Sequence, residues 1–127
     1  MSTTTPPEDG EHRTHFVDGS LDAVEHFAGG VKSGPCEYRY RNGRVKARGQ
    51  FADGVFTGEW VWWRENGVLL QKGSFVEGRQ HGFRQRWHAT GELMDEGEWV
   101  HGTRSGEWKH YDKEGRPLKT ENHPDRR

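Results

Sequence analysis

The chain has 127 residues, of which 29% are hydrophobic and 12% aromatic, and its formal net charge is −1. This length allows one domain, and the near-zero net charge argues against a nucleic-acid partner. The single cysteine, Cys36, excludes an intramolecular disulfide, and we expect it to be a small buried hydrophobic residue. No stretch approaches the ~18 apolar residues of a membrane helix, so we expect a cytoplasmic protein.

The first segment of the chain, residues 1–15, is rich in Ser, Thr, Pro and acidic residues. Because this composition is typical of disorder, we expect a disordered acidic leader there. Residues 1–30 carry a net charge of −5, whereas residues 31–127 carry +4. The leader is therefore acidic and the body of the chain mildly basic.

From residue 16 onward the chain repeats with a period of 24 residues, over units 16–39, 40–63, 64–87 and 88–111 and a partial fifth unit from Asp112. Several series of glycines and aromatic residues share this frame. They are Gly19, Gly43, Gly67, Gly91 and Gly115; Gly49, Gly73 and Gly97; and Phe27, Phe51, Phe75 and Trp99. Such a period is the signature of a repeat protein, in which each unit packs against its neighbours.

Within each unit the local pattern predicts two strands. Val45, Ala47, Gly49 and Phe51 alternate with polar residues, which is typical of a strand with one apolar face. Asn-Gly and Asp-Gly pairs separate such runs and favour tight hairpin turns. We therefore predict an all-β fold, a single-layer elongated antiparallel meander of about eight strands over residues 16–118, followed by a polar tail over 119–127. A neighbouring aromatic ring is expected to cover each mid-strand glycine.

Units such as YRNGRVKARGQFADGVFTGEWVWW and HATGELMDEGEWVHGTRSGEWKHY resemble MORN repeats, specifically the bacterial MORN-variant form, over about residues 16–118. The resemblance implies a curved sheet of stacked hairpins that contacts proteins or, in some members, phospholipids. The resemblance to the bacterial form also implies a role as an antitoxin or as the partner of a toxin gene, the role assigned to some of its members. The chain departs from the pattern at Cys36 and Arg84, which occupy the usual aromatic position, and at Phe83, which stands one residue early.

No catalytic or cofactor-binding pattern is present, so we expect a non-enzymatic protein without a cofactor. The eight histidines occupy different positions of the repeat, and a zinc site needs three or four converging ligands, so no metal site is predicted. Strand alternation places Asp95 on the face opposite Glu96 and Glu98. We interpret these three as solvated strand charges and not as paired catalytic carboxylates.

The aromatic residues are the best candidates for a function. A single-layer sheet without helices leaves large side chains exposed or covered by a partner, and large exposed apolar patches mark interaction sites. Trp62 stands out, because its equivalents are Tyr38, Arg86 and His110. The predicted partner-binding residues are Trp60, Trp62, Trp63, Arg64, Phe83, Arg84, Arg86, Trp87, Trp108 and Tyr111.

The predicted function is a protein–protein interaction module, with an antitoxin or immunity-type partner of a bacterial toxin as its most specific form. Two alternatives stay open. Arg39, Arg41, Arg44, Lys46 and Arg48 form a basic stretch that would suit an anionic membrane surface, although alternation divides them between two faces. Tryptophans beside arginines would suit single-stranded nucleic acid. Homo-oligomerisation through the open sheet edges is a further expectation.

Overall fold

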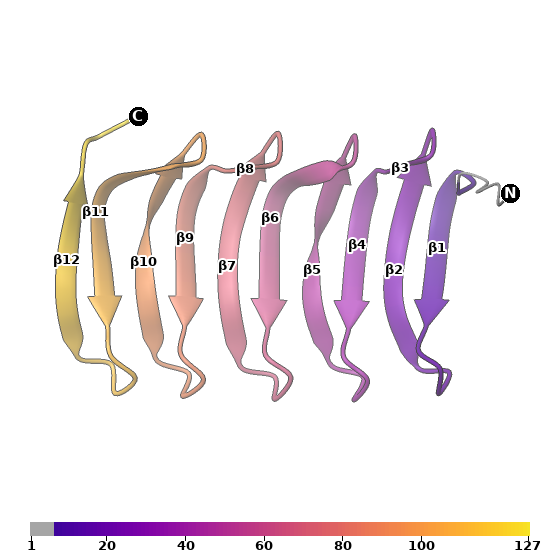
Figure 1. Ribbon diagram of the computed structural model, residues 1–127, viewed down its shortest axis with the longest axis horizontal. Coiled ribbons are helices and arrows are strands. Elements are labelled where there is room, and N and C mark those ends of the chain that lie inside the picture. The colour runs from indigo at the N-terminus through magenta and orange to yellow at the C-terminus, as the bar shows by residue number, and fades with distance from the viewer. Residues whose placement is uncertain (1–6) are drawn as a thin grey trace, which may run out of the picture.

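The structure, a computed structural model, describes residues 7–127, and every regular element in that range is a strand of one sheet (Figure 1). The strands are β1 (Gly10–His15), β2 (Leu21–Ala28), β3 (Val31–Lys32), β4 (Gly34–Arg39), β5 (Val45–Ala52), β6 (Val55–Trp63), β7 (Leu69–Val76), β8 (Arg79–Gln80), β9 (Gly82–Trp87), β10 (Leu93–Val100), β11 (Thr103–Tyr111) and β12 (Pro117–His123).

The strands lie side by side in chain order, and neighbours pair antiparallel. The main path is β1-β2-β4-β5-β6-β7-β9-β10-β11-β12, while the two-residue strands β3 and β8 pair with the ends of β2 and β7. Over the described residues the sheet forms one open layer (Figure 1). This arrangement confirms the predicted all-β meander of hairpins.

At one end of the strands, five turns have the same hydrogen-bonding pattern. In the second turn the amide of Gly43 donates to the carbonyl of Tyr40, and the amide of Tyr40 donates to the carbonyl of Arg44, both at 2.9 Å. The same two hydrogen bonds recur at residues 16–20, 64–68, 88–92 and 112–116. Five copies at a spacing of 24 residues confirm the period found in the sequence.

At the other end, the strands are joined by two-residue hairpin turns. Asp53 and Gly54 have φ values of 49° and 81°, and the pairs at residues 77–78 and 101–102 are alike. A turn with positive φ at both central residues is the type I′ turn, whose twist matches that of the flanking strands. The turns stack on one another, since the amide of Gly54 donates to the carbonyl of Lys32 at 2.9 Å.

The ends of the sheet differ from the prediction. Gly10–His15, expected to be disordered, forms β1 and pairs with β2, for instance His12 with Glu25. At the other end β12 extends to His123, into the segment expected to be a polar tail. A strand needs a backbone partner and not an apolar composition, which explains the misassignment. Residues 1–6 of the predicted leader lie outside the described residues.

Aromatic rings from the next strand cover two of the three mid-strand glycines, as predicted, whereas Gly73 is covered by Arg84. A Cβ atom on Gly49 would lie 2.1 Å from Cδ2 of Trp60, and one on Gly97 would lie 2.2 Å from Cδ2 of Trp108. Neither tryptophan is more than 1% exposed. The rings therefore occupy the space that the glycines leave, and the thin layer obtains its core from this contact.

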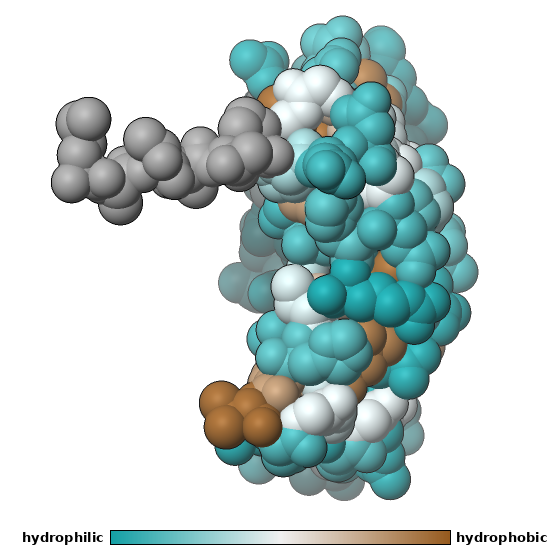
Figure 2. Space-filling model, turned by 90° about the vertical axis from the view of Figure 1, so that its right-hand side faces the viewer, coloured by the Kyte–Doolittle hydropathy of each residue, from teal (hydrophilic) through white to brown (hydrophobic). Residues whose placement is uncertain are grey.

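The sheet is bent along its strands, so that its outline is a crescent when viewed along the row of strands (Figure 2). Strand pairing defines two faces. We call one the aromatic face; its central row runs across five strands through Tyr38, Ala47, Trp62, Gln71 and Arg86. The other, the opposite face, carries the adjacent row of Glu37, Arg48, Val61, Lys72 and Gln85.

Candidate partner-binding site

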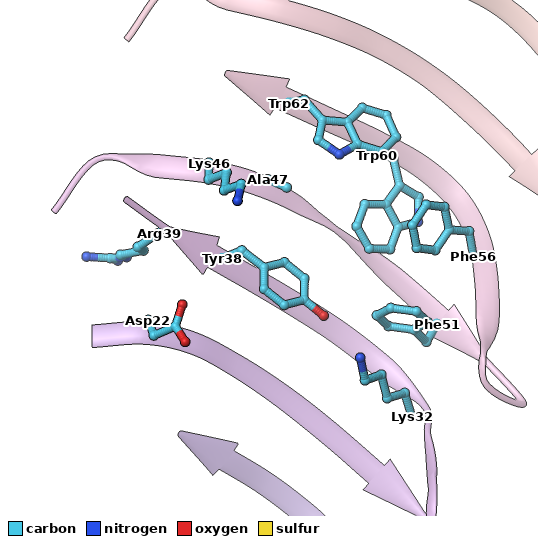
Figure 3. A pocket seen from close by; sticks show the side chains of 10 residues that line it. All are labelled: Asp22, Lys32, Tyr38, Arg39, Lys46, Ala47, Phe51, Phe56, Trp60 and Trp62. Carbon is cyan, nitrogen blue, oxygen red and sulfur yellow. The ribbon is translucent and has the colours of Figure 1, made fainter. Parts of the chain in front are cut away.

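The aromatic face contains a groove of about 400 Å³ over the first two units (Figure 3). Five strands, β2 to β6, supply its walls. Its lining residues are Asp22, Lys32, Tyr38, Arg39, Lys46, Ala47, Phe51, Phe56, Trp60 and Trp62.

The floor of the groove is a set of packed rings. Phe56 stacks on Trp60 with ring centres 3.9 Å apart, and Phe51 meets Trp60 edge-on at 5.3 Å. Residues four apart in a regular strand are separated by ~13 Å, so this stacking requires a distortion of β6. The distortion is at Gly58, whose φ of 67° coincides with a register shift between β5 and β6.

The indole N–H of Trp60 donates to the carbonyl of Gln50 at 3.0 Å, and the side chain is only 1% exposed. Trp60 is therefore fixed on both its apolar and its polar side. Trp62 lies parallel to it with ring centres 5.6 Å apart and is half-buried. Since Trp60 forms the floor and Trp62 the wall, the groove presents ring surface whose orientation is set before any ligand arrives.

The rim of the groove is cationic on balance. Lys32, Arg39 and Lys46 stand against a single carboxylate, Asp22, among its lining residues (Figure 3). Nζ of Lys32 lies 5.1 Å from the centre of the Phe51 ring and 2.8 Å from a carboxylate oxygen of Glu25. The groove thus combines an apolar floor with a charged margin, where Lys32 is paired with Glu25 and Arg39 with Glu37.

One hydrogen bond fixes the far wall. The Tyr38 hydroxyl donates to the Glu25 carboxylate. Burial, followed by this hydrogen bond, raises the pKa of Tyr38. Burial works to raise the pKa of Glu25, but the hydrogen bonds from Lys32 and Tyr38 outweigh it and lower that pKa. Both effects keep the phenol neutral and the carboxylate charged.

The same face carries charged residues over the later units. We define the ionic cluster as Arg84, Arg86, Asp95, Arg104, His110, Lys119 and Glu121. Arg84 is 7% exposed and covers Gly73, where a Cβ atom would lie 3.1 Å from its Cγ. Arg84 therefore fills the place that Trp60 and Trp108 fill in the other units.

Asp95 is the centre of the ionic cluster and corrects the prediction of a solvated charge, because it is only 1% exposed. Its carboxylate accepts from Nε of Arg86 at 3.0 Å and lies 3.5 Å from Nη2 of Arg84. Burial works to raise the pKa of Asp95, but hydrogen bonding and charge from Arg86 outweigh it and lower that pKa. As predicted by alternation, Glu96 lies on the opposite face, where it accepts from Gln85.

Tryptophan rings enclose the cluster from the next unit. The guanidinium of Arg84 lies 5.5 Å from the ring centre of Trp99 and 5.1 Å from that of Trp108. Arg104 approaches the Trp108 ring at 4.5 Å. Guanidinium groups over ring faces gain cation–π attraction, which offsets part of the cost of burying Arg84.

Residues 56–77 match the family model of the MORN repeat variant. This segment begins at the groove residue Phe56 and covers β6, β7 and the turn that follows. The match supports a MORN-repeat protein, and MORN repeats are in general binding modules without catalytic chemistry. A search of curated proteins gives no match.

Three of the predicted contact residues are buried in the sheet. Trp60, Trp108 and Arg84 are at most 7% exposed, and each covers a strand glycine. A side chain enclosed in this way holds the sheet together and cannot present itself to a partner. We therefore remove these three from the candidate surface.

Four other predicted contact residues, Trp63, Arg64, Trp87 and Tyr111, lie near the turns at the ends of the strands or on the opposite face. Trp63 stacks under Arg48, a residue of the opposite face, with the guanidinium 5.7 Å from its ring centre. Its equivalents are Trp87 and Tyr111. Their backbone carbonyls accept hydrogen bonds from the turn that begins the same unit, from Nη2 of Arg64 at 2.9 Å and from Nε2 of His88 at 2.8 Å. Each such bond joins one turn to the strand that leads into the next turn.

The remaining three are divided between the faces. Phe83 is 55% exposed and pairs with Glu98 on the opposite face. Trp62 and Arg86 lie on the aromatic face in the central row. Only these two of the ten predicted residues lie on the face that holds the groove and remain accessible there.

Sequence reasoning missed Lys32, Phe51 and Phe56 as groove residues. Phe51 and its equivalents were found as a periodic series, but period alone does not distinguish a core ring from a groove wall. Phe56 has a glutamine, Gln80, at the equivalent position of the next unit. Two features of the sequence could have identified Phe56 as a groove residue: the difference between Phe56 and Gln80, and the glycine at position 58, which distorts the strand.

Cys36 is buried at 4% exposure, as expected. Burial raises the pKa of its thiol to about 11, so the thiol stays protonated at neutral pH. It packs with Ala47 and Trp60 in the hydrophobic core beneath the groove.

Over residues 7–127, no three His, Cys, Asp or Glu side chains are grouped so that they could hold a metal ion. Within the same range there is no helix of the length and apolarity needed to cross a membrane.

Proposed function

We propose that the protein is a protein-binding module whose aromatic-face groove receives an apolar side chain of its partner. One observation carries the proposal: rings of Phe51, Phe56 and Trp62 line a groove on a sheet face that no other layer within residues 7–127 covers. Part-exposed aromatic residues in a preformed hollow are typical anchoring sites of interfaces.

The ordered floor supports this function. Trp60 is held by ring packing and by its hydrogen bond to Gln50, so little conformational entropy is lost when a partner binds. MORN repeats are in general binding modules, which agrees with a protein-binding function. In its most specific form, we propose that the partner is a bacterial toxin and the protein its antitoxin or immunity protein.

A membrane-surface role finds less support. In the basic stretch that motivated it, Arg39 and Arg48 both pair with Glu37, at 2.7 and 2.8 Å. Ion pairs of this kind reduce the positive field that an anionic membrane would require.

The test is recovery of the full chain from its native host after mild crosslinking, with Trp62→Ala compared with Trp63→Ala as a matched control. Both variants remove one half-buried tryptophan, but only Trp62 lines the groove. We expect the partner to be lost with Trp62→Ala and kept with Trp63→Ala. Recovery of the native chain without any partner would exclude the function, and a partner encoded by the adjacent gene would support the toxin hypothesis.

A further inference from the structure

The groove wall and the ionic cluster are aligned on the aromatic face. Trp62 of β6 pairs with Gln71 of β7, and Gln71 pairs with Arg86 of β9. Trp62 and Arg86 are therefore directly in line, two strands apart. With neighbouring strands ~4.8 Å apart, the two positions are separated by ~10 Å. A segment that fills the groove and crosses the strands toward β9 passes Gln71 and reaches Arg86.

The cluster presents positive charge at its surface. It contains four permanent cations, Arg84, Arg86, Arg104 and Lys119, but two carboxylates, Asp95 and Glu121. The carboxylate of Asp95 is 2% exposed, whereas the side chain of Arg86 is 37% exposed and that of Lys119 is 63% exposed. Arg86 is paired with Asp95 and Lys119 with Glu121, but the cluster has two more cations than carboxylates. An approaching ligand therefore meets a surface of net positive charge, on which Arg86 and Lys119 are exposed.

We propose that the partner segment is acidic as well as apolar: a carboxylate three residues away from the side chain in the groove pairs with Arg86. The inference rests on the proposed protein-binding function and specifies the chemistry of the partner. Charge complementarity selects a carboxylate, and the groove rings of Phe51 and Trp62 select an aliphatic or proline side chain beside it.

The spacing of three residues follows from backbone geometry. In an extended strand, residues on the same side are two or four apart, which corresponds to ~7 or ~13 Å, and neither matches the ~10 Å between the two positions. In a polyproline II helix, residues three apart lie on the same side and ~9.3 Å apart. The segment therefore binds in polyproline II conformation, across the strands, as proline-containing segments do in other aromatic-lined grooves.

Synthetic peptides test this directly with the full chain. The probe is the capped peptide Ser-Pro-Leu-Pro-Pro-Asp-Pro-Ser, in which the acid follows leucine by three positions. Binding is followed by tryptophan fluorescence and calorimetry. We expect an about tenfold weaker Kd when Asp is replaced by Asn, and a similar loss when the acid is moved one position closer to or farther from leucine. Raising the salt concentration should narrow these differences.

Protein variants give the reciprocal test. Arg86→Gln should abolish the preference for Asp over Asn, whereas Arg48→Gln, on the opposite face, should leave it unchanged. Circular dichroism checks that Arg86→Gln is folded. If it is not, the Asp-to-Asn comparison on the unmodified chain still decides the question.

Four outcomes would overturn the inference. Two concern the peptides: the Asp and Asn peptides bind equally well, or neither binds. The other two concern a different occupant: phosphatidylserine vesicles bind the chain and the peptide does not displace them, or light scattering shows a dimer to which the peptide does not bind. Equal binding that is lost in Trp62→Ala would reject the carboxylate but leave the proposed function standing, since that function is judged by recovery from the native host.

Discussion

The second unit and the third unit share one backbone frame but carry different chemistry on the aromatic face. In the second unit Trp60 covers Gly49 and Trp62 forms the groove wall. In the third unit Arg84 covers Gly73, and Arg86 takes the position of Trp62. The repeat therefore specifies that a large side chain must cover the strand glycine, and leaves open whether that side chain is a ring or a guanidinium.

The difference matters for what each region can tolerate. A tryptophan over a glycine is held by burial and by its own hydrogen bond to the backbone, as Trp60 is to Gln50, whereas a buried guanidinium depends on its carboxylate. The contact at Gly49 is also closer than that at Gly73, 2.1 Å against 3.1 Å for an added Cβ atom. The groove region should thus be sensitive to added volume and the ionic region to lost charge.

Asp95→Ala is expected to have the largest effect. It removes a carboxylate that is 1% exposed and leaves the buried Arg84 without its partner, which typically costs about 3–5 kcal/mol. Urea unfolding followed by circular dichroism measures the loss. The double variant Arg84→Met/Asp95→Ala removes both charges and should recover most of that stability. A double variant as unstable as Asp95→Ala would show that the charges themselves are not the cause.

Gly49→Ala should follow, with a loss of about 3 kcal/mol, because the added methyl group collides with the fixed Trp60 ring. Gly73→Ala should cost only about 1 kcal/mol, since the alkyl chain of Arg84 can shift by a few tenths of an ångström. The two variants are compared in the same urea titration. Equal losses of stability would contradict the idea that a glycine under a tryptophan ring tolerates added volume less well than a glycine under an arginine.

Acid should weaken the ionic region. Hydrogen bonding and charge from Arg86 hold the pKa of Asp95 below its ordinary value of 3.8, so its contribution is complete above that value and is lost as pH falls through the lower folded-state pKa. We expect the urea midpoint of the native chain to fall on going from pH 5 to pH 3. The fall should be smaller in Arg84→Met/Asp95→Ala, which lacks this carboxylate. An identical fall in both proteins would mean that carboxylates other than Asp95 cause the acid sensitivity.

Cys36 provides the mildest test, because it requires no substitution. Burial raises the pKa of its thiol to about 11, and the thiolate is the reactive form. At pH 8 a thiol reagent should therefore modify the folded chain no faster than the chain opens, and should modify it rapidly in urea. Rapid labelling without urea would mean that the core beneath the groove is open.

The architecture was predictable from the sequence because turns are encoded locally. Asp53-Gly54 forms the positive-φ turn that such pairs favour. The prediction of a ring over each strand glycine was correct for Gly49 and Gly97 but wrong for Gly73, which Arg84 covers. Gly10–His15 was missed because a strand at the end of a sheet is held by backbone pairing, which composition does not reveal. The last strand, β12, was missed for the same reason.

The candidate site was only partly predictable. Alternation gave the correct face for Asp95 but not its burial, because Arg84 and the rings of the next unit enclose it. Trp62 and Arg86 were found because they depart from the repeat. Phe56 was missed because its contact with Trp60 depends on the distortion at Gly58, and a periodic pattern assumes regular strands.

The hairpin connectivity also has a kinetic consequence. Each strand pairs with its neighbours in the chain, and the hydrogen bonds that join successive turns, such as Arg64 to the carbonyl of Trp87, span only 23 residues. The loops that must close during folding are therefore short, and their entropic cost is small. Folding can begin at any hairpin and spread in both directions, so the ends should open first and the central hairpins last.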